Sequence, residues 1–194
     1  MTSHSASSSG HHGVCNWWIA HTFDNPLRRL IHKPHKVLGN YVQAGMTVMD
    51  LGCGMGHFSM GMAGLVGGTG RVIAVDLQQK MLDVMERRAQ RARLSDRILP
   101  HLCRADDIGV NEPVDFILAF WMVHEVPDQS HFFKQLKALL TANGKILIAE
   151  PKMHVSAEDL NSTVDIAQSR GLHCIAKPKI SFSHTALMGH NPKC

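Results

Sequence analysis

The sequence of 194 residues has no apolar run that approaches the roughly 20 residues needed to span a bilayer. Its first residues, MTSHSASSSGHHG, also lack the apolar centre of a secretory signal. Neither a membrane protein nor a secreted protein is therefore predicted. We expect a soluble, cytoplasmic protein without a membrane partner.

Neither the cysteine content nor the net charge indicates a function. The five cysteines form an odd set without a CxxC pair, which favours neither a disulfide framework nor a sequence-local zinc site. The formal net charge is only +4, so charge alone does not indicate a nucleic-acid partner.

Two basic clusters stand out from this even distribution. One lies in a predicted helix and contains Arg87, Arg88, Arg91 and Arg93. The other lies nearer the N-terminus and contains Arg28, Arg29, Lys33 and Lys36, with His32 and His35. The first is typical of a solvated helix face. The second either contacts an acidic or phosphate-bearing substrate or is simply solvated.

Changes in composition along the sequence divide the chain into three predicted segments. Residues 1–13 are mainly Ser, His and Gly and are interpreted as a disordered tail. Residues 14–44 contain short helical patterns broken at Pro26 and Pro34, which predicts a helical cap or lid. Residues 45–190 form the main domain.

Short runs of mostly apolar and β-branched residues follow Gly45. They are TVMDL (47–51), RVIAVDL (71–77), RILPHLC (97–103), VDFILAF (114–120) and KILIAE (145–150). Because helical patterns lie between them, the sequence predicts βαβ units in an α/β fold. The sheet is then doubly wound and mostly parallel, with helices on both faces. The last two runs, LHCIAKPK and ISFSHTALM, leave no room for a helix and predict an antiparallel pair.

Local helix signals can be placed on this outline. One helical face is predicted to carry Leu77, Met81, Met85, Arg88 and Ala92. Another is predicted to carry Phe132, Leu136, Leu139 and Leu140. Asn143 and Gly144 are expected to close that second helix in the left-handed conformation. Ser156 and Asp159 have the spacing of a capping box.

A glycine-rich turn follows the first predicted strand. Gly52, Gly54 and Gly56 precede the helical stretch HFSMGMAGLV. Because glycine has no Cβ atom, the backbone amides of this turn can approach a ligand closely. Tight turns also need glycine for steric reasons alone. However, Asp76 ends the next strand twenty positions after Gly56, where a carboxylate can bind both ribose hydroxyls. Together these features indicate a nucleoside-containing cofactor.

Two neighbouring residues distinguish between nucleoside cofactors. A dinucleotide site needs a further glycine where this sequence has His57. Asp50 lies just before the turn, where its charge would repel a pyrophosphate but suit an ammonium group. A nucleoside that carries a cationic amino acid therefore fits better than NAD.

These residues are similar to the motifs of the class I S-adenosylmethionine-dependent methyltransferases. The likeness covers about residues 37–188 and includes VMDLGCGMG, VIAVDLQQKML, CRADDI and VDFILAFWMVHEVPD. It implies a Rossmann-like, seven-stranded sheet with the last strand antiparallel. It implies that the cofactor S-adenosylmethionine contacts Asp50, Gly52, Cys53, Gly54, Gly56, Asp76 (ribose), Leu77 (adenine), Asp106 or, in reserve, Asp107 (adenine amino group), Phe120 and Trp121.

His124 is the candidate base at the end of the fourth predicted strand. Its alternative role is to pack or cap the following turn. Glu125, Glu150 and His154 also fall at or after the carboxyl ends of strands, where Glu125 and His154 are candidates to line the substrate pocket. With His124 these residues offer mixed nitrogen and oxygen ligands, but no local ligand spacing supports a metal, so none is predicted.

Trp17 and Trp18 are unusual apolar residues just after the predicted tail. They form either a lid that excludes water or an aromatic membrane anchor. The lid is preferred, because Pro26 leaves too short a segment for an amphipathic surface helix.

The preferred function is methyl transfer from S-adenosylmethionine to a small-molecule acceptor by in-line displacement. No NPPY-like run follows the fourth strand, so no nucleic-acid partner is expected. A non-catalytic cofactor-binding or regulatory protein is the first alternative. An NAD-dependent oxidoreductase is the second, which Asp50 and His57 disfavour.

Overall fold

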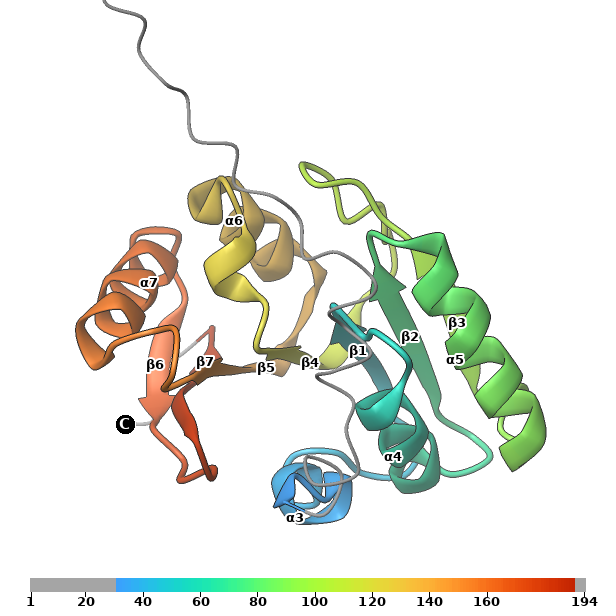
Figure 1. Ribbon diagram of the computed structural model, residues 1–194. Coiled ribbons are helices and arrows are strands. Elements are labelled where there is room, and N and C mark those ends of the chain that lie inside the picture. Colours follow the sequence, from blue (N-terminus) through green and yellow to red (C-terminus); the bar gives the residue numbers. More distant parts are fainter. Residues whose placement is uncertain (1–30, 191–194) are drawn as a thin grey trace, which may run out of the picture.

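The computed structural model describes residues 31–190. Seven strands form one sheet in the order β3-β2-β1-β4-β5-β7-β6 (Figure 1). They are β1 (Thr47–Leu51), β2 (Arg71–Asp76), β3 (Ile98–Leu102), β4 (Val114–Phe120), β5 (Leu140–Pro151), β6 (His173–Ala176) and β7 (Ser183–Gly189). Only β7 runs antiparallel to its neighbours β5 and β6. The predicted doubly wound sheet with an antiparallel last strand is confirmed.

Helices cover both faces of the sheet (Figure 1). Their bounds are α3 (Pro34–Leu38), α4 (His57–Val66), α5 (Gln79–Ala92), α6 (Gln129–Leu139) and α7 (Ala157–Ser169), with a 3₁₀ turn η1 (Val123–Glu125) after β4. One buried cluster joins α3, α4 and α5 to the sheet, and a second joins α6 and α7 to its opposite face. Central strand β4 is buried along nearly all of its length, which explains its continuous apolar run.

The inward face of α5 differs from the predicted one. The buried residues are Met81, Leu82, Met85 and Ala89. Leu77 precedes the helix and is 43% exposed. The predicted face included Leu77, but the helix starts only at Gln79. The buried face is displaced by about one residue from the predicted one.

The junction of α6 and β5 also differs from the prediction. The helix ends at Leu139, and Leu140 is already extended and pairs with Val114. Asn143 and Gly144 do not adopt positive φ. A register shift between Val114 and Phe116 accommodates the intervening residues, so no left-handed helix closure is needed.

Two other local predictions are confirmed. Ser156 and Asp159 form a complete capping box at the start of α7. Pro34 lies in the first turn of α3 and packs on α4. A Cβ at Gly61 would lie only 2.1 Å from Pro34 Cβ, so glycine permits this close helix contact.

The rest of the predicted lid, including Trp17 and Trp18, lies outside residues 31–190. Within those residues, every helix is too short or too polar to cross a bilayer.

Candidate active site

The glycine loop between β1 and α4 meets two different demands. Gly52, Gly54 and Gly56 have φ values of 64°, 52° and 81°, in the left-handed region that favours glycine. A Cβ at Gly56 would lie 2.4 Å from Met85 Cγ, so this glycine is required for packing against α5. A Cβ at Gly54 would meet nothing within 4 Å. The open side of Gly54 therefore leaves room for a ligand next to the backbone.

Asp76 lies beside this open backbone at the end of β2. The Gly54 amide donates to its Oδ2 at 2.8 Å, and the Gln78 amide donates to its Oδ1 at 2.9 Å. Burial raises the pKa of the Asp76 carboxyl, while the backbone amides act in the opposite direction. Each carboxylate oxygen can still accept another hydrogen bond, so the pair fits the two hydroxyls of a ribose. The loop and Asp76 thus fit the predicted cofactor.

Asp50 and His57 frame the glycine loop. Asp50 is buried and accepts a hydrogen bond of 2.5 Å from Ser59 Oγ of α4. His57 is the first residue of α4, and its Nε2 lies 2.8 Å from the carbonyl oxygen of His32. A glycine at position 57 could not make that contact, so His57 joins the segment before α3 to the cofactor loop.

Residues after β3 lie near the same edge of the sheet. The Cys103 amide donates to the Asp76 carbonyl, which brings the chain back to the end of β2. Asp106 is exposed, with its Oδ1 3.5 Å from Arg104 Nε. Asp107 accepts from the Gly109 amide at 2.9 Å, so its carboxylate is partly used within its own turn. Each of the two carboxylates therefore has one partner close by in the segment after β3.

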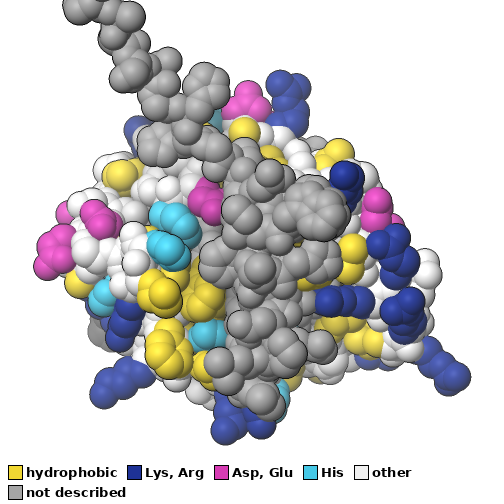
Figure 2. Space-filling model, viewed as in Figure 1, with side chains coloured by type: hydrophobic (Ala, Val, Ile, Leu, Met, Phe, Trp, Pro, Cys, Tyr) yellow, Lys and Arg dark blue, Asp and Glu magenta, His cyan; other side chains and the backbone are white. Residues whose placement is uncertain are grey.

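Cys53 lies within the glycine loop, and the basic run lies on α5. Burial raises the pKa of the Cys53 thiol well above its ordinary value, so Cys53 is a packing residue and not a nucleophile. Figure 2 shows Lys and Arg side chains along the α5 edge. Arg87, Arg91 and Arg93 are exposed as predicted. Arg88 is an exception, because its guanidinium donates to the Met55 carbonyl at 2.9 Å.

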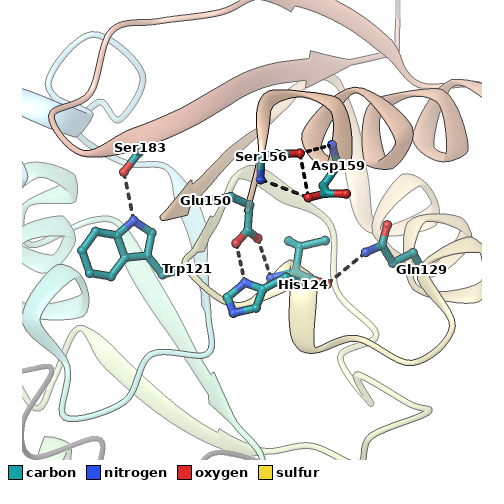
Figure 3. Close-up of polar contacts among 8 residues, drawn as sticks. Trp121, His124, Gln129, Glu150, Ser156, Asp159 and Ser183 are labelled. Atoms are coloured by element: carbon teal, nitrogen blue, oxygen red, sulfur yellow. Dashed lines mark hydrogen bonds and ion pairs between the residues drawn. The ribbon is translucent and has the colours of Figure 1, made fainter. Parts of the chain in front are cut away.

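Phe120 and Trp121 end β4 at the centre of the sheet edge. Trp121 has a φ of 60°, which costs a bulky residue about 1–2 kcal/mol. Its amide donates to the Ala149 carbonyl at 2.7 Å, and its Nε1 donates to Ser183 Oγ at 2.9 Å (Figure 3). The His32 ring lies edge-on, with centroids 5.1 Å from Phe120 and 5.3 Å from Trp121. These contacts hold Trp121 in its strained conformation.

His124 and Glu150 form a close pair just beyond Trp121 (Figure 3). Nδ1 of His124 lies 2.5 Å from Oε2 of Glu150, and the Val123 amide donates to Oε1 at 2.8 Å. Glu150 is buried, whereas the His124 side chain is 30% exposed. The hydrogen bond and charge of Glu150 raise the pKa of His124, because they favour the imidazolium form. The ring is thus held by one nitrogen and offers the other.

Glu125 and His154, the other residues predicted to line the substrate pocket, lie in the turns after β4 and β5. Burial raises the pKa of Glu125, which follows His124 in η1. His154 is exposed in the turn after β5, and its amide donates to the Pro151 carbonyl. Within residues 31–190, no group of three or more His, Cys, Asp or Glu side chains is arranged to hold a metal ion.

The sequence grouped Glu150 with His124 at the carboxyl ends of neighbouring strands, but only as possible ligands, and did not indicate that Glu150 orients the His124 ring. The missing information was the strand register, in which Phe120 of β4 lies opposite Ala149 of β5. Adjacent parallel strands end at the same edge, so a carboxylate one residue further on lies against the turn after β4.

Comparison with known proteins identifies the family of this chain. Residues 42–181 match the family model of a methyltransferase domain. A demethylmenaquinone methyltransferase of Lactobacillus johnsonii is 29% identical over 143 residues, which are 72% of this chain and 56% of that protein. The chain spans about half the length of the first curated relatives that it matches.

Solved structures show the same fold. A SAM-dependent methyltransferase from Aquifex aeolicus superposes with a TM-score of 0.77 at 21% identity, covering 89% of this chain and 97% of that one. Fibrillarin from Aeropyrum pernix, solved with natively bound S-adenosyl-L-methionine, has a TM-score of 0.61 at 18% identity, covering 76% and 68%. Because the family model covers most of its length, the chain belongs to the methyltransferase-domain family, and it has the fold of these SAM-dependent methyltransferases.

Proposed function

We propose that this enzyme methylates a small-molecule acceptor at an atom that carries a proton, with His124 as the base. The His124–Glu150 pair is the observation that carries the proposal. It lies at the carboxyl ends of β4 and β5, where open α/β sheets bind ligands, and one ring nitrogen is already committed to Glu150. The curated relatives named demethylmenaquinone methyltransferases support a small-molecule acceptor.

The proposed cofactor, S-adenosylmethionine, would supply an activated methyl group on a sulfonium, so the protein mainly has to align and desolvate the acceptor. In the transfer, the acceptor oxygen or nitrogen would bond to the methyl carbon while sulfur kept the electrons of the broken bond. The acceptor proton would then have to leave. Nε2 of His124 takes it, while Glu150 fixes the tautomer by accepting from Nδ1 and stabilises the resulting imidazolium.

The cofactor contacts belong to the same proposal. Asp76 binds the ribose, Leu77 lies against adenine, and Asp106 accepts from the adenine amino group, with Asp107 as the reserve. Asp50, Cys53 and the loop glycines surround the methionine part, and Phe120 and Trp121 face the reactive end. Glu125 and His154, with Trp17 and Trp18 of the proposed lid, complete the acceptor pocket.

The test is methylation of a panel of phenols, catechols and reduced quinones, followed by release of the demethylated cofactor. Wild-type enzyme is expected to methylate at least one of them. His124→Gln should lower kcat by about 100-fold, as expected for loss of a general base. Its affinity for S-adenosylmethionine, measured by isothermal titration, should not change. His131→Gln, an exposed histidine of α6, is the matched control.

Two results would contradict the proposal. An undiminished kcat in His124→Gln would leave His124 with a packing role only. Tight cofactor binding without methylation of any small molecule would refute the proposed acceptor class.

A further inference from the structure

A groove lies beside the proposed active site, between α7 and the segment that joins β6 to β7. Its volume is about 530 Å³, within the roughly 300–1,000 Å³ of small-molecule sites. Lys152 contributes from the end of β5, and Lys177 and Lys179 contribute from the segment before β7. Asn161 of α7 and His184 of β7 add polar side chains to the lining. Two parts of the chain thus bring cationic side chains to one hollow.

The charge in this groove is not neutralised from within. Its described lining contains no Asp or Glu. Among residues 31–190, no ion pair involves Lys152, Lys177 or Lys179. Lys177 Nζ donates to Asn161 Oδ1 at 2.9 Å, which places that ammonium group over α7. The groove therefore presents like charges that an anion would stabilise.

Two of the three hydroxyl groups of the lining, those of Ser183 and Thr185, are already engaged. Thr185 Oγ1 donates to the Pro178 carbonyl. Ser183 Oγ accepts from Trp121 Nε1 and donates to the Ser181 carbonyl. The lysines are consequently the main donors for a ligand, which favours a charged group over a neutral polar one.

The groove adjoins the proposed active site through β5 and β7. Glu150 pairs with His184, and Pro151 pairs with Ser183. Side chains of paired residues point to the same face, with Cβ atoms about 5 Å apart. His184 of the groove is therefore the cross-strand neighbour of the carboxylate that holds His124.

We propose that this groove binds an anionic group, a carboxylate or a phosphate, carried by the methyl acceptor. Lys152, Lys177 and Lys179 bind the anion, and the acceptor atom extends past His184 to His124. The proposal rests on the proposed small-molecule methyl transfer and names its substrate class. The small size of the groove favours a small molecule over a nucleic acid, which needs a longer basic track.

The direct test is NMR titration of the full chain with inorganic phosphate and with benzoate, against chloride at equal ionic strength. Amide signals of residues 152–161 and 177–185 should shift and saturate. The triple variant Lys152→Gln/Lys177→Gln/Lys179→Gln should bind at least about tenfold more weakly, because each lost ammonium removes a charge-assisted hydrogen bond. The charge-matched control Arg87→Gln/Arg91→Gln/Lys134→Gln removes three exposed cations elsewhere and should bind as wild type does.

A kinetic comparison connects anion binding to the acceptor. For an acceptor that carries a carboxylate, the lysine triple variant should raise KM about tenfold and change kcat less than twofold. The neutral amide of the same acceptor should show no such difference. If the whole panel goes unmethylated, the proposed function fails, while the phosphate and benzoate titrations still decide the groove.

Three outcomes would overturn the inference. One is a set of shifts that does not saturate, and another is equal binding by the lysine triple variant. The third is tighter binding of a single-stranded oligonucleotide through the same lysines, with a steep salt dependence, which would assign the groove to nucleic acid.

Discussion

The two halves of the site are built in different ways. Around the cofactor loop, the chain uses mainly backbone groups, such as the Gly54 amide that donates to Asp76. Around the proposed acceptor site, it uses contacts between pairs of side chains. His124 pairs with Glu150, 26 residues away, and Trp121 with Ser183, 62 residues away. The cofactor half therefore depends on backbone conformation. The chemistry of the acceptor half depends on individual side chains and can be changed by single substitutions.

The largest expected effect tests the backbone shape of the cofactor half. Gly56→Ala should lower the free energy of unfolding by about 2–4 kcal/mol, because a Cβ would overlap Met85 and the φ of 81° disfavours alanine. The measurement is urea denaturation. In the same helix region, Gly64→Ala is the control, because its Cβ would meet nothing within 4 Å. It should be neutral or stabilise by up to about 1 kcal/mol. Equal effects of the two variants would show that packing on Met85 does not constrain the loop.

A smaller effect tests the chemistry of the cofactor half. Asp76→Ala should weaken S-adenosylmethionine binding by about 100-fold, because two hydrogen bonds from ribose to a carboxylate would be lost. Isothermal titration measures this, with circular dichroism to verify the fold. Asp83→Ala on α5 is the control, since Asp83 only accepts from Gln79 on the helix surface. Unchanged affinity in Asp76→Ala would mean that ribose binds elsewhere.

The smallest effect tests the acceptor half. Glu150→Gln should lower kcat/KM at neutral pH by roughly five- to tenfold, because a neutral amide orients His124 but stabilises the imidazolium less. Since Glu150 raises the pKa of His124, its replacement should move the acidic limb of the kcat/KM profile to lower pH. The measurement is kcat/KM between pH 5 and 9, a range around the ordinary histidine pKa of about 6.5.

The same substitution has a consequence for stability. A raised His124 pKa stabilises the folded state fully below the ordinary histidine pKa, and this contribution is lost as pH rises through the folded value. The free energy of unfolding contributed by the pair should therefore fall with rising pH in wild type and stay flatter in Glu150→Gln. An unmoved kinetic limb together with an unchanged stability profile would show that Glu150 does not tune His124.

Local sequence signals predicted most of the sheet. Strands β1 and β4 and helix α4 have the bounds expected from their apolar runs and their flanking glycines. The glycine loop and Asp76 were also found, because their spacing along the chain is enough to place them at one edge. Where two local signals competed, as at Asn143 and Gly144, the pairing of Leu140 with Val114 decided the structure instead.

The acceptor half was less predictable for a physical reason. The Glu150 contact depends on which strands are neighbours, and the lysine groove depends on how α7 packs beside the segment before β7. Neither arrangement produces a hydrophobic periodicity or a motif spacing that can be recognised in the sequence. The positive φ of Trp121 is similarly imposed by its contacts with Ala149 and Ser183, because no bulky residue prefers that conformation by itself.

The place of β7 has a consequence for folding during synthesis. It is the last of the described strands along the chain, yet it lies between β5 and β6, and within residues 31–190 β6 pairs with no other strand. While the ribosome is still making residues 183–189, the sheet edge of β5 that binds β7 is open. The cofactor half can assemble earlier, because its strands are already complete. The nascent chain should therefore acquire its cofactor loop well before Ser183 arrives to hold Trp121, and the acceptor side should form after the cofactor side.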